Sequence, residues 1–323
     1  MRFIIYGIGA IGGTFAAALA RAGHDVLGIA RGRMLEAIRS NGGLTFRTPS
    51  GSGLVSFPVA ATPQDVAFRP DDIIFLTMKG QDTGAALEAL REAGVTTQTI
   101  VCAQNGVNNE RLALRLFPNV YAMTVMLPAD YVTPGEVICY GRPKLGMVDI
   151  GRYPRGLDDT VASIATAMDS AGFAAFPLEQ VMPSKYGKLR ENLGNVIEAA
   201  VGHGARTAAM MRPVQTEADE VYAAAGIEPV AIGNADPRRK GLMEMGPVEG
   251  VARTGGSSVQ SLKRGTGSIE TDYLNGEIVL LGRLHGVPTP LNDALVAIGH
   301  ELIRKGAGPG SMSEAELRTR LGV

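Results

Sequence analysis

Three polar side chains in the stretch KYGKLRENLGN are spaced so that they could act together on a small substrate. The stretch predicts a helix over residues 185–201. Taking Lys188 as zero and about 100° per residue, Asn192 lies near about +40° and Asn195 near about −20°. A lysine flanked by neutral amides suits a small anionic substrate, because the ammonium polarises a carbonyl or donates a proton while the amides fix orientation. Lys185, near about +60° on the same helix, is a rival for the acid, and a solvated polar face is the alternative.

A second group of residues could bind a dinucleotide. Glycines at the spacing G-x-G-x-x-G follow the apolar run FIIY, and the alanine-rich residues 14–22 predict a helix after them. In strand, turn and helix, the first glycine permits the turn, the second lets a pyrophosphate approach the backbone, and the third allows close packing. The helix N-terminus presents N–H groups to the phosphates. A glycine-rich turn in an unrelated α/β domain is the alternative. The predicted cofactor contacts are Gly7, Ile8, Gly9, Ala10, Ile11 and Gly12.

The end of the second predicted strand, residues 24–29, distinguishes between the two nicotinamide cofactors. An NAD enzyme usually places a carboxylate here for the ribose 2′-OH, whereas an NADP enzyme has space and an arginine for the 2′-phosphate. Arg31 follows this strand without a carboxylate at its tip, and Arg33 stands beside it. We therefore predict NADP(H), with two solvated surface arginines as the alternative.

The composition excludes several function classes. Lys and Arg number 31 against 32 Asp and Glu, so there is no basic field for nucleic acid and no polybasic membrane patch. The apolar runs are too short to span a bilayer. Cys102 and Cys139 make no disulfide framework, and the four histidines are scattered without metal-ligand spacing. We expect a cytoplasmic protein with no metal site.

Buried strands that alternate with helices predict the fold. The runs DIIFLTM (72–78) and TIVCA (99–103) are typical of strands buried in a parallel sheet. Lys79 and Asn105 follow them, at the carboxyl edge where doubly wound sheets bind ligands. We predict an α/β protein with an N-terminal Rossmann-type doubly wound sheet, followed by an all-helical C-terminal domain. The predicted domains are an NADP-binding domain over 1–180 and a substrate-binding domain over 181–323.

Capping residues suggest where several helices begin. Asn109 is a plausible N-cap for a helix over 110–117, and Ser268 for a long helix that ends at 284. Thr289-Pro290 predicts a helix that ends at 305, and Ser313 with Glu316 predicts a final capped helix. Residues 44–59 suggest a hairpin or an irregular loop, and residues 228–256 are too rich in Gly and Pro to assign. No clear buried strand follows residue 183.

Together these residues resemble the ketopantoate reductase (2-dehydropantoate 2-reductase) family over nearly the whole chain. The matching motifs are Gly7-x-Gly9-x-x-Gly12, Arg31, Lys79 in LTMKG, Gln104-Asn105-Gly106, Lys188-Leu-x-x-Asn192, Ser257-Ser258-Val-Gln, Glu270-Thr-Asp272-Tyr273-Leu-Asn275-Gly276 and HGVPTP. The resemblance implies a cytoplasmic enzyme that uses NADPH to reduce the ketone of a 2-oxo acid, making pantoate on the way to pantothenate and coenzyme A.

The resemblance also implies roles for single residues. Lys188 matches the family's general acid, and Glu270 matches a catalytic carboxylate near the nicotinamide that interacts with this lysine. Asn105 matches a residue that touches both nicotinamide and substrate. Further matches are Asn192 as a substrate-orienting amide, Ser258 as the hydroxyl that holds the substrate carboxylate, and Lys79 and Ala129 as cofactor contacts.

One position departs from the family, which commonly has a second asparagine where this chain has Val196. Asn195 could replace that amide from a shifted direction, or the pocket could be more apolar. This leaves a D-2-hydroxy acid dehydrogenase for a bulkier 2-oxo acid as an alternative function. A non-catalytic NADPH-binding sensor is a third. The helical half could also form a homodimer interface, although no periodic stripe establishes one.

Overall fold

The computed structural model describes residues 1–205, 207–265 and 267–323, which form two compact units. Unit 1 comprises Met1–Met182 and Gly233–Ala252, and unit 2 comprises Pro183–Ile232 and Arg253–Val323. The predicted domains 1–180 and 181–323 remain a prediction, because a compact unit is defined by contacts and not by function. The ranges differ chiefly in Gly233–Ala252, which belongs to unit 1 although it lies far along the chain.

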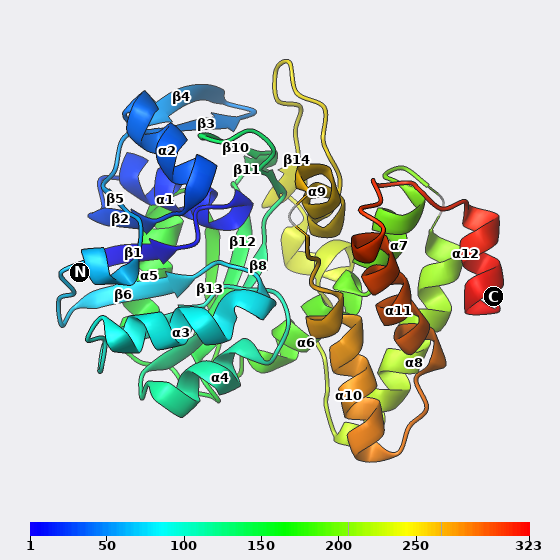
Figure 1. Ribbon diagram of the computed structural model, residues 1–323. Helices are drawn as coiled ribbons and strands as arrows, with labels where there is room; N and C mark the ends of the chain where they lie inside the picture. Colours follow the sequence, from blue (N-terminus) through cyan, green and yellow to red (C-terminus); the bar gives the residue numbers. More distant parts are fainter. Residues whose placement is uncertain (206, 266) are drawn as a thin grey trace. The chain divides into compact units, whose positions relative to one another are not determined.

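Unit 1 is built on a sheet with the strand order β13-β12-β8-β7-β6-β1-β2-β5 (Figure 1). Neighbouring strands are parallel except for the antiparallel pair β8 and β12. Every residue of β6 is buried, as expected for a strand covered on both faces. This sheet confirms the predicted doubly wound α/β class. The strands are β1 (Arg2–Tyr6), β2 (Val26–Ile29), β5 (Val59–Ala60), β6 (Asp72–Leu76), β7 (Thr99–Cys102), β8 (Val120–Met126), β12 (Met147–Arg152) and β13 (Ala174–Pro177).

Helices cover both faces of this sheet (Figure 1). On one face α1, α2 and α5 bury their apolar side chains in a core that includes Phe15, Met34 and Ile164. On the other face α3 and α4 bury Leu87, Leu90 and related side chains. The helices are α1 (Ala10–Arg21), α2 (Gly32–Asn41), α3 (Thr83–Glu92), α4 (Asn109–Leu116) and α5 (Asp159–Ser170), with short 3-10 turns η1 (Pro63–Asp65) and η2 (Gly80–Asp82).

A smaller sheet with the order β4-β3-β10-β9 packs beside α1. The antiparallel pairing of β3 and β4 confirms the hairpin suggested for residues 44–59. The strands are β3 (Leu44–Thr48), β4 (Gly51–Val55), β9 (Ala129–Asp130) and β10 (Glu136–Cys139).

The segment Gly233–Ala252 returns to unit 1 through a strand and an ion pair. Its strand β14 (Met243–Met245) pairs with β11 (Gly141–Pro143). Two of the three residues of β14 are exposed, so it does not contradict the expectation of no clear buried strand after residue 183. The Arg238 guanidinium donates to both carboxylate oxygens of Asp149 on β12, at 2.8 and 3.2 Å. It also pairs with Asp236 and lies 4.6 Å from the centre of the Phe176 ring. The segment also contains η3 (Gly233–Ala235) and η4 (Pro237–Arg239).

Unit 2 is helical, as the sequence predicts for this region. Its elements are α6 (Met182–Asn192, whose first residue belongs to unit 1), α7 (Asn195–Val201), α8 (Ala208–Ala225), α9 (Ser257–Arg264), η5 (Thr271–Tyr273), α10 (Asn275–His285), α11 (Pro290–Arg304) and α12 (Glu314–Leu321). The helix expected after Thr289-Pro290 is present, and the Ser313 hydroxyl accepts a hydrogen bond from the Glu316 N–H as predicted. Within the described ranges, every helix is too short or too polar to span a bilayer.

Three predicted helix boundaries were wrong. The helix over 185–201 is interrupted between α6 and α7, and the helix capped by Ser268 begins instead at Asn275, after η5. Asn109 does not cap α4 but is its first residue. In each case side-chain contacts to other elements decide the boundary, and local capping preference does not.

We predict that Arg238→Ala lowers the free energy of unfolding by ~3 kcal/mol, because it leaves Asp149 with a buried and unpaired carboxylate. The Asp149 side chain is only 5% exposed. Arg190→Ala is the matched control: Arg190 also makes a two-point pair, with Asp219, but on a partly exposed surface. Its loss should cost about 1 kcal/mol or less. If urea unfolding showed the same loss of free energy of unfolding in both variants, the anchoring role of Arg238 would be contradicted.

Candidate functional site

In the predicted dinucleotide turn, Gly7 and Gly12 lie too close to neighbouring atoms to carry a side chain, whereas Gly9 does not. Gly7 has a φ of +108°, and a Cβ there would lie 2.9 Å from the Met78 backbone nitrogen. A Cβ on Gly12 would lie 2.2 Å from the Gly7 carbonyl oxygen and 2.4 Å from the Thr77 hydroxyl oxygen. A Cβ on Gly9 would meet no described atom within 4 Å. The turn therefore opens at the glycine that lets a pyrophosphate approach.

Thr77 contacts the backbone of this turn through its hydroxyl, and no sequence pattern singled it out. Its hydroxyl oxygen lies 2.9 Å from the Tyr6 carbonyl oxygen and 2.8 Å from that of Gly7. At the start of α1, Gly9 is the N-cap, and among the described residues no side chain caps this end. The first N–H groups of a helix have no intrahelical acceptor, so these groups suit a phosphate ligand.

Arg31 lies where a 2′-phosphate contact was predicted. It follows β2 as the N-cap residue of α2, and its side chain is 86% exposed. Its Nη2 is 3.5 Å from an Asp82 carboxylate oxygen in η2, a weak and solvated pair that costs little to exchange. Lys79 is the N-cap residue of the same η2 turn, and the Asp82 N–H donates to its carbonyl. The two cationic side chains predicted to bind the cofactor therefore come from neighbouring segments of unit 1.

Asn105 follows β7, the strand beside β6, as the sequence predicts. It is half-buried, and its carbonyl accepts a hydrogen bond from the Asn109 amide at 2.9 Å. Ala129 lies in β9 of the smaller sheet, opposite Cys139. Its cofactor contact remains a prediction.

Lys188 and Asn192 lie one turn apart on α6, in unit 2. Asn192 is only 7% exposed, and its Nδ2 is buried without a hydrogen-bond partner among the described residues. A buried amide donor without a partner costs about 1–3 kcal/mol. Lys185, the rival acid, lies on the preceding turn and is 2% exposed.

The helix is interrupted between α6 and α7, directly before Asn195. The Leu193 carbonyl accepts from the Asn275 amide, and a Cβ on Gly194 would lie 2.2 Å from the Met211 sulfur. The angular argument for a continuous stripe therefore fails at this point. Asn195 begins α7, and its amide donates to the Ser257 hydroxyl at 3.4 Å.

Ser258 is buried in the first turn of α9, next to the residue that Asn195 contacts. From the same face of α7, Glu198 accepts from the Gly256 N–H at 3.0 Å. Val196, where the family commonly has asparagine, is 1% exposed and belongs to the packed interior. Asn195 therefore faces the predicted carboxylate-binding segment while the neighbouring position is part of the core.

Glu270 is 6% exposed and is the N-cap residue of η5. It lies in unit 2 with Lys188, Asn192, Asn195 and Ser258. The predicted substrate residues other than Asn105 thus belong to the helical unit, whereas the glycine turn, Arg31 and Lys79 belong to unit 1.

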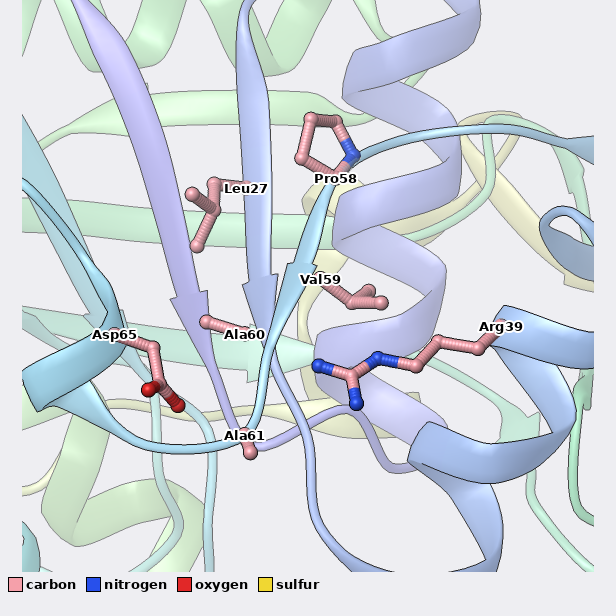
Figure 2. Close-up of a pocket in the computed structure, with 7 residues that line it drawn as sticks. All are labelled: Leu27, Arg39, Pro58, Val59, Ala60, Ala61 and Asp65. Atoms are coloured by element: carbon pink, nitrogen blue, oxygen red, sulfur yellow. The ribbon is translucent and has the colours of Figure 1, made fainter.

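A cavity of about 510 Å³ lies at the edge strand β5, and none of the predicted site residues lines it. Figure 2 shows Arg39 of α2 and Asp65 of η1 on either side of this strand. The cavity is lined by Leu27, Arg39, Pro58, Val59, Ala60, Ala61 and Asp65. Its lining offers neither a glycine turn nor a buried amide, so the residues singled out above are the better candidate site.

Comparison with protein families decides which family has these features. The family model described as Ketopantoate reductase PanE/ApbA matches residues 3–154, and its C-terminal counterpart matches residues 191–302. The chain belongs to the ketopantoate reductase PanE/ApbA family. Membership confirms the expected class, an NADP-dependent oxidoreductase acting on a CH–OH group.

Curated relatives and solved structures cover nearly all of the chain. It is 28% identical to the 2-dehydropantoate 2-reductase of Pyrococcus horikoshii, over 92% of this chain and 96% of that protein. The crystal structure of a PanE/ApbA family ketopantoate reductase from Ralstonia eutropha JMP134 has 29% identity and a TM-score of 0.75, covering 95% of this chain and 99% of that one. A ternary structure of D-mandelate dehydrogenase with NADH and anilino(oxo)acetate has 22% identity and a TM-score of 0.77, with the same coverage, and shows likeness of fold alone.

The glycine turn of this ketopantoate reductase family member fits the family's cofactor. The space beside Gly9 and the uncapped start of α1 suit a pyrophosphate, and the exposed Arg31 guanidinium suits a 2′-phosphate. These residues would hold NADP(H) through its phosphates.

We predict opposite outcomes for alanine at two glycines of the turn. Gly9→Ala should weaken NADPH binding by on the order of 10-fold or more and change stability by less than about 0.5 kcal/mol, because the new methyl group meets no described atom. Gly12→Ala should lose ~2 kcal/mol of stability through overlap, although helix propensity alone favours alanine by about 1 kcal/mol. Fluorescence titration with NADPH and thermal unfolding measure the two effects. A stabilised Gly12→Ala protein would contradict the close approach.

Proposed function

We propose that this protein reduces a small 2-oxo acid to the 2-hydroxy acid with NADPH, with 2-dehydropantoate as the first candidate substrate. The observation that carries this proposal is the buried amide donor of Asn192, which has no partner among the described residues and lies one helical turn from Lys188. Such a donor is costly unless a ligand supplies its acceptor. A ketone or carboxylate oxygen of a 2-oxo acid is an acceptor of the required kind.

The proposed chemistry assigns a separate role to each predicted site residue. NADPH, when bound, supplies the hydride that the carbonyl carbon receives. The Lys188 ammonium polarises the carbonyl oxygen and gives it the proton that completes the alcohol. Asn105 and Asn192 orient the carbonyl, and the Ser258 hydroxyl holds the substrate carboxylate. Glu270 takes the role that the family resemblance implies, a carboxylate near the nicotinamide that interacts with the lysine.

The relatives named 2-dehydropantoate 2-reductase support pantoate, a precursor of pantothenate and coenzyme A, as the product. The buried Val196 favours a second candidate, a D-2-hydroxy acid dehydrogenase that acts on a bulkier 2-oxo acid, since one amide expected in this region is missing. A cytoplasmic location and a homodimer remain predictions. So does the third alternative, an NADPH sensor without turnover.

We predict that Lys188→Ala lowers kcat by about 10²–10⁴-fold while NADPH affinity stays within about 3-fold of wild type. Loss of NADPH absorbance with 2-dehydropantoate and with an aromatic 2-oxo acid measures turnover and separates the two enzymatic candidates. Lys185→Ala is the matched comparison on the same helix. If turnover survives in Lys188→Ala and is lost in a folded Lys185→Ala, the rival lysine is the acid. If the wild-type protein binds NADPH but does not oxidise it with any 2-oxo acid, the sensor alternative holds.

We also predict different effects at the two neighbouring positions of α7. Asn195→Ala should raise the KM for the 2-oxo acid by about 10-fold with little change in NADPH affinity, because it removes the contact to Ser257 beside Ser258. Val196→Asn should instead lose ~2 kcal/mol of stability, because it places an amide in the packed interior. Unchanged stability with improved turnover in Val196→Asn would show that position 196 faces substrate.

A further inference from the structure

A chain of buried hydrogen bonds ends on the backbone of Asn105. Gln104 Nε2 donates to the Thr83 hydroxyl oxygen at 2.6 Å, and that hydroxyl donates to Asn109 Oδ1 at 2.8 Å. Asn109 Nδ2 then donates to the Asn105 carbonyl oxygen at 2.9 Å. The three side chains are 5%, 0% and 2% exposed, respectively. The two bonds between side chains are shielded from water and are worth more than surface bonds, and the bond to the Asn105 carbonyl is part-buried.

The order of donors and acceptors in this chain is fixed by the residue types. A threonine hydroxyl has one proton, and donating it to Asn109 leaves the oxygen lone pairs to accept from Gln104. Because Asn109 accepts on Oδ1, its Nδ2 faces the Asn105 carbonyl as a donor. Of asparagine and its isostere, ionised aspartate, only the amide accepts on one side and donates on the other. An aspartate of the same shape would set a carboxylate oxygen against the carbonyl oxygen.

The chain of bonds connects two loops that carry predicted site residues. β6 and β7 are parallel neighbours, with Leu76 opposite Cys102, so the loops after them leave the same edge of the sheet. Lys79 lies in the first loop, which ends where Thr83 begins α3. Asn105 lies in the second loop, which ends where α4 begins. Fixing the Asn105 carbonyl fixes the plane of the peptide that follows it, at Gly106, whose φ is +81°.

We propose that Thr83 and Asn109 are positioning residues that hold Asn105 in the orientation needed for the reaction. The inference rests on the proposed function, because the role of Asn105 does. Neither residue touches the reacting atoms: Asn109 acts through the Asn105 carbonyl, and Thr83 acts by orienting the Asn109 amide. A displacement of about 1 Å at a substrate-orienting group costs on the order of 10²-fold in rate.

The test compares isosteric variants. Asn109→Asp and Thr83→Val should each lower kcat by about 10- to 100-fold, with the Kd for NADPH within about 3-fold of wild type. Thr83→Ser keeps the hydroxyl and should restore kcat to within about 3-fold. In hydrogen–deuterium exchange without cofactor, residues 103–108 should exchange faster in Asn109→Asp and Thr83→Val than in wild type or Thr83→Ser.

Asn119→Asp is the matched control. The Asn119 amide also donates to a loop carbonyl, that of Thr97 at 2.6 Å, but just before β8 and not in the loop that carries Asn105. Asn119→Asp should leave kcat and the exchange of residues 103–108 unchanged. Circular dichroism confirms that each variant is folded. If Asn109→Asp does not fold, the comparison of Thr83→Val with Thr83→Ser tests the positioning role by itself.

The outcomes separate this inference from the proposed function. Wild-type exchange of residues 103–108 in both Asn109→Asp and Thr83→Val would overturn the positioning role, whatever the turnover. Faster exchange with unchanged kcat would also overturn it, because the loop would then be held without consequence for the reaction. If wild type reduces no 2-oxo acid, the proposed function fails, and with it the catalytic meaning of the positioning.

Discussion

Unit 1 depends on the contact between α1 and the turn that precedes it. Gly12 lies so close to the Gly7 carbonyl and the Thr77 hydroxyl that no side chain fits there. This contact lets α1 begin shortly after the carboxyl end of β1, and the first N–H groups of the helix have no intrahelical acceptor. β6 lies beside β1 and β7 beside β6, so the loops with Lys79 and Asn105 leave the sheet at the same edge.

Unit 2 depends on a different constraint, a buried polar network that interrupts a helix. The Asn275 amide donates to the Leu193 carbonyl and to Asn292 Oδ1. Asn292 in turn donates to the buried carboxylate of Glu217, which also accepts the Asn292 backbone N–H at the start of α11. Each polar group in this network forms a hydrogen bond with a group on another element. The network therefore fixes α8, α10 and α11 around the end of α6. The resulting break gives Asn192 and Asn195 different surroundings.

The two units therefore differ in how closely they follow the family pattern. The glycine turn, Arg31 and Lys79 keep the residue types that a phosphate-rich cofactor needs, and the local geometry fits those types. On the helical side, Val196 belongs to the interior and Asn195 contacts the first turn of α9. A cofactor shared across a family constrains its contacts strongly. A substrate pocket is not constrained in this way when a side chain at a neighbouring position can make the same contact.

We could predict from local sequence patterns the fold class, the dinucleotide turn and the edge of the sheet at which Lys79 and Asn105 lie. These features depend on local patterns: apolar runs, glycine spacing, and the rule that parallel strands end at one edge. Tertiary structure alone decided the break after Asn192, the late start of α10 and the bonds of Asn109. In each case a side chain forms a hydrogen bond with a backbone or side-chain group elsewhere in the chain. Neither the helical period nor capping preference identifies that partner.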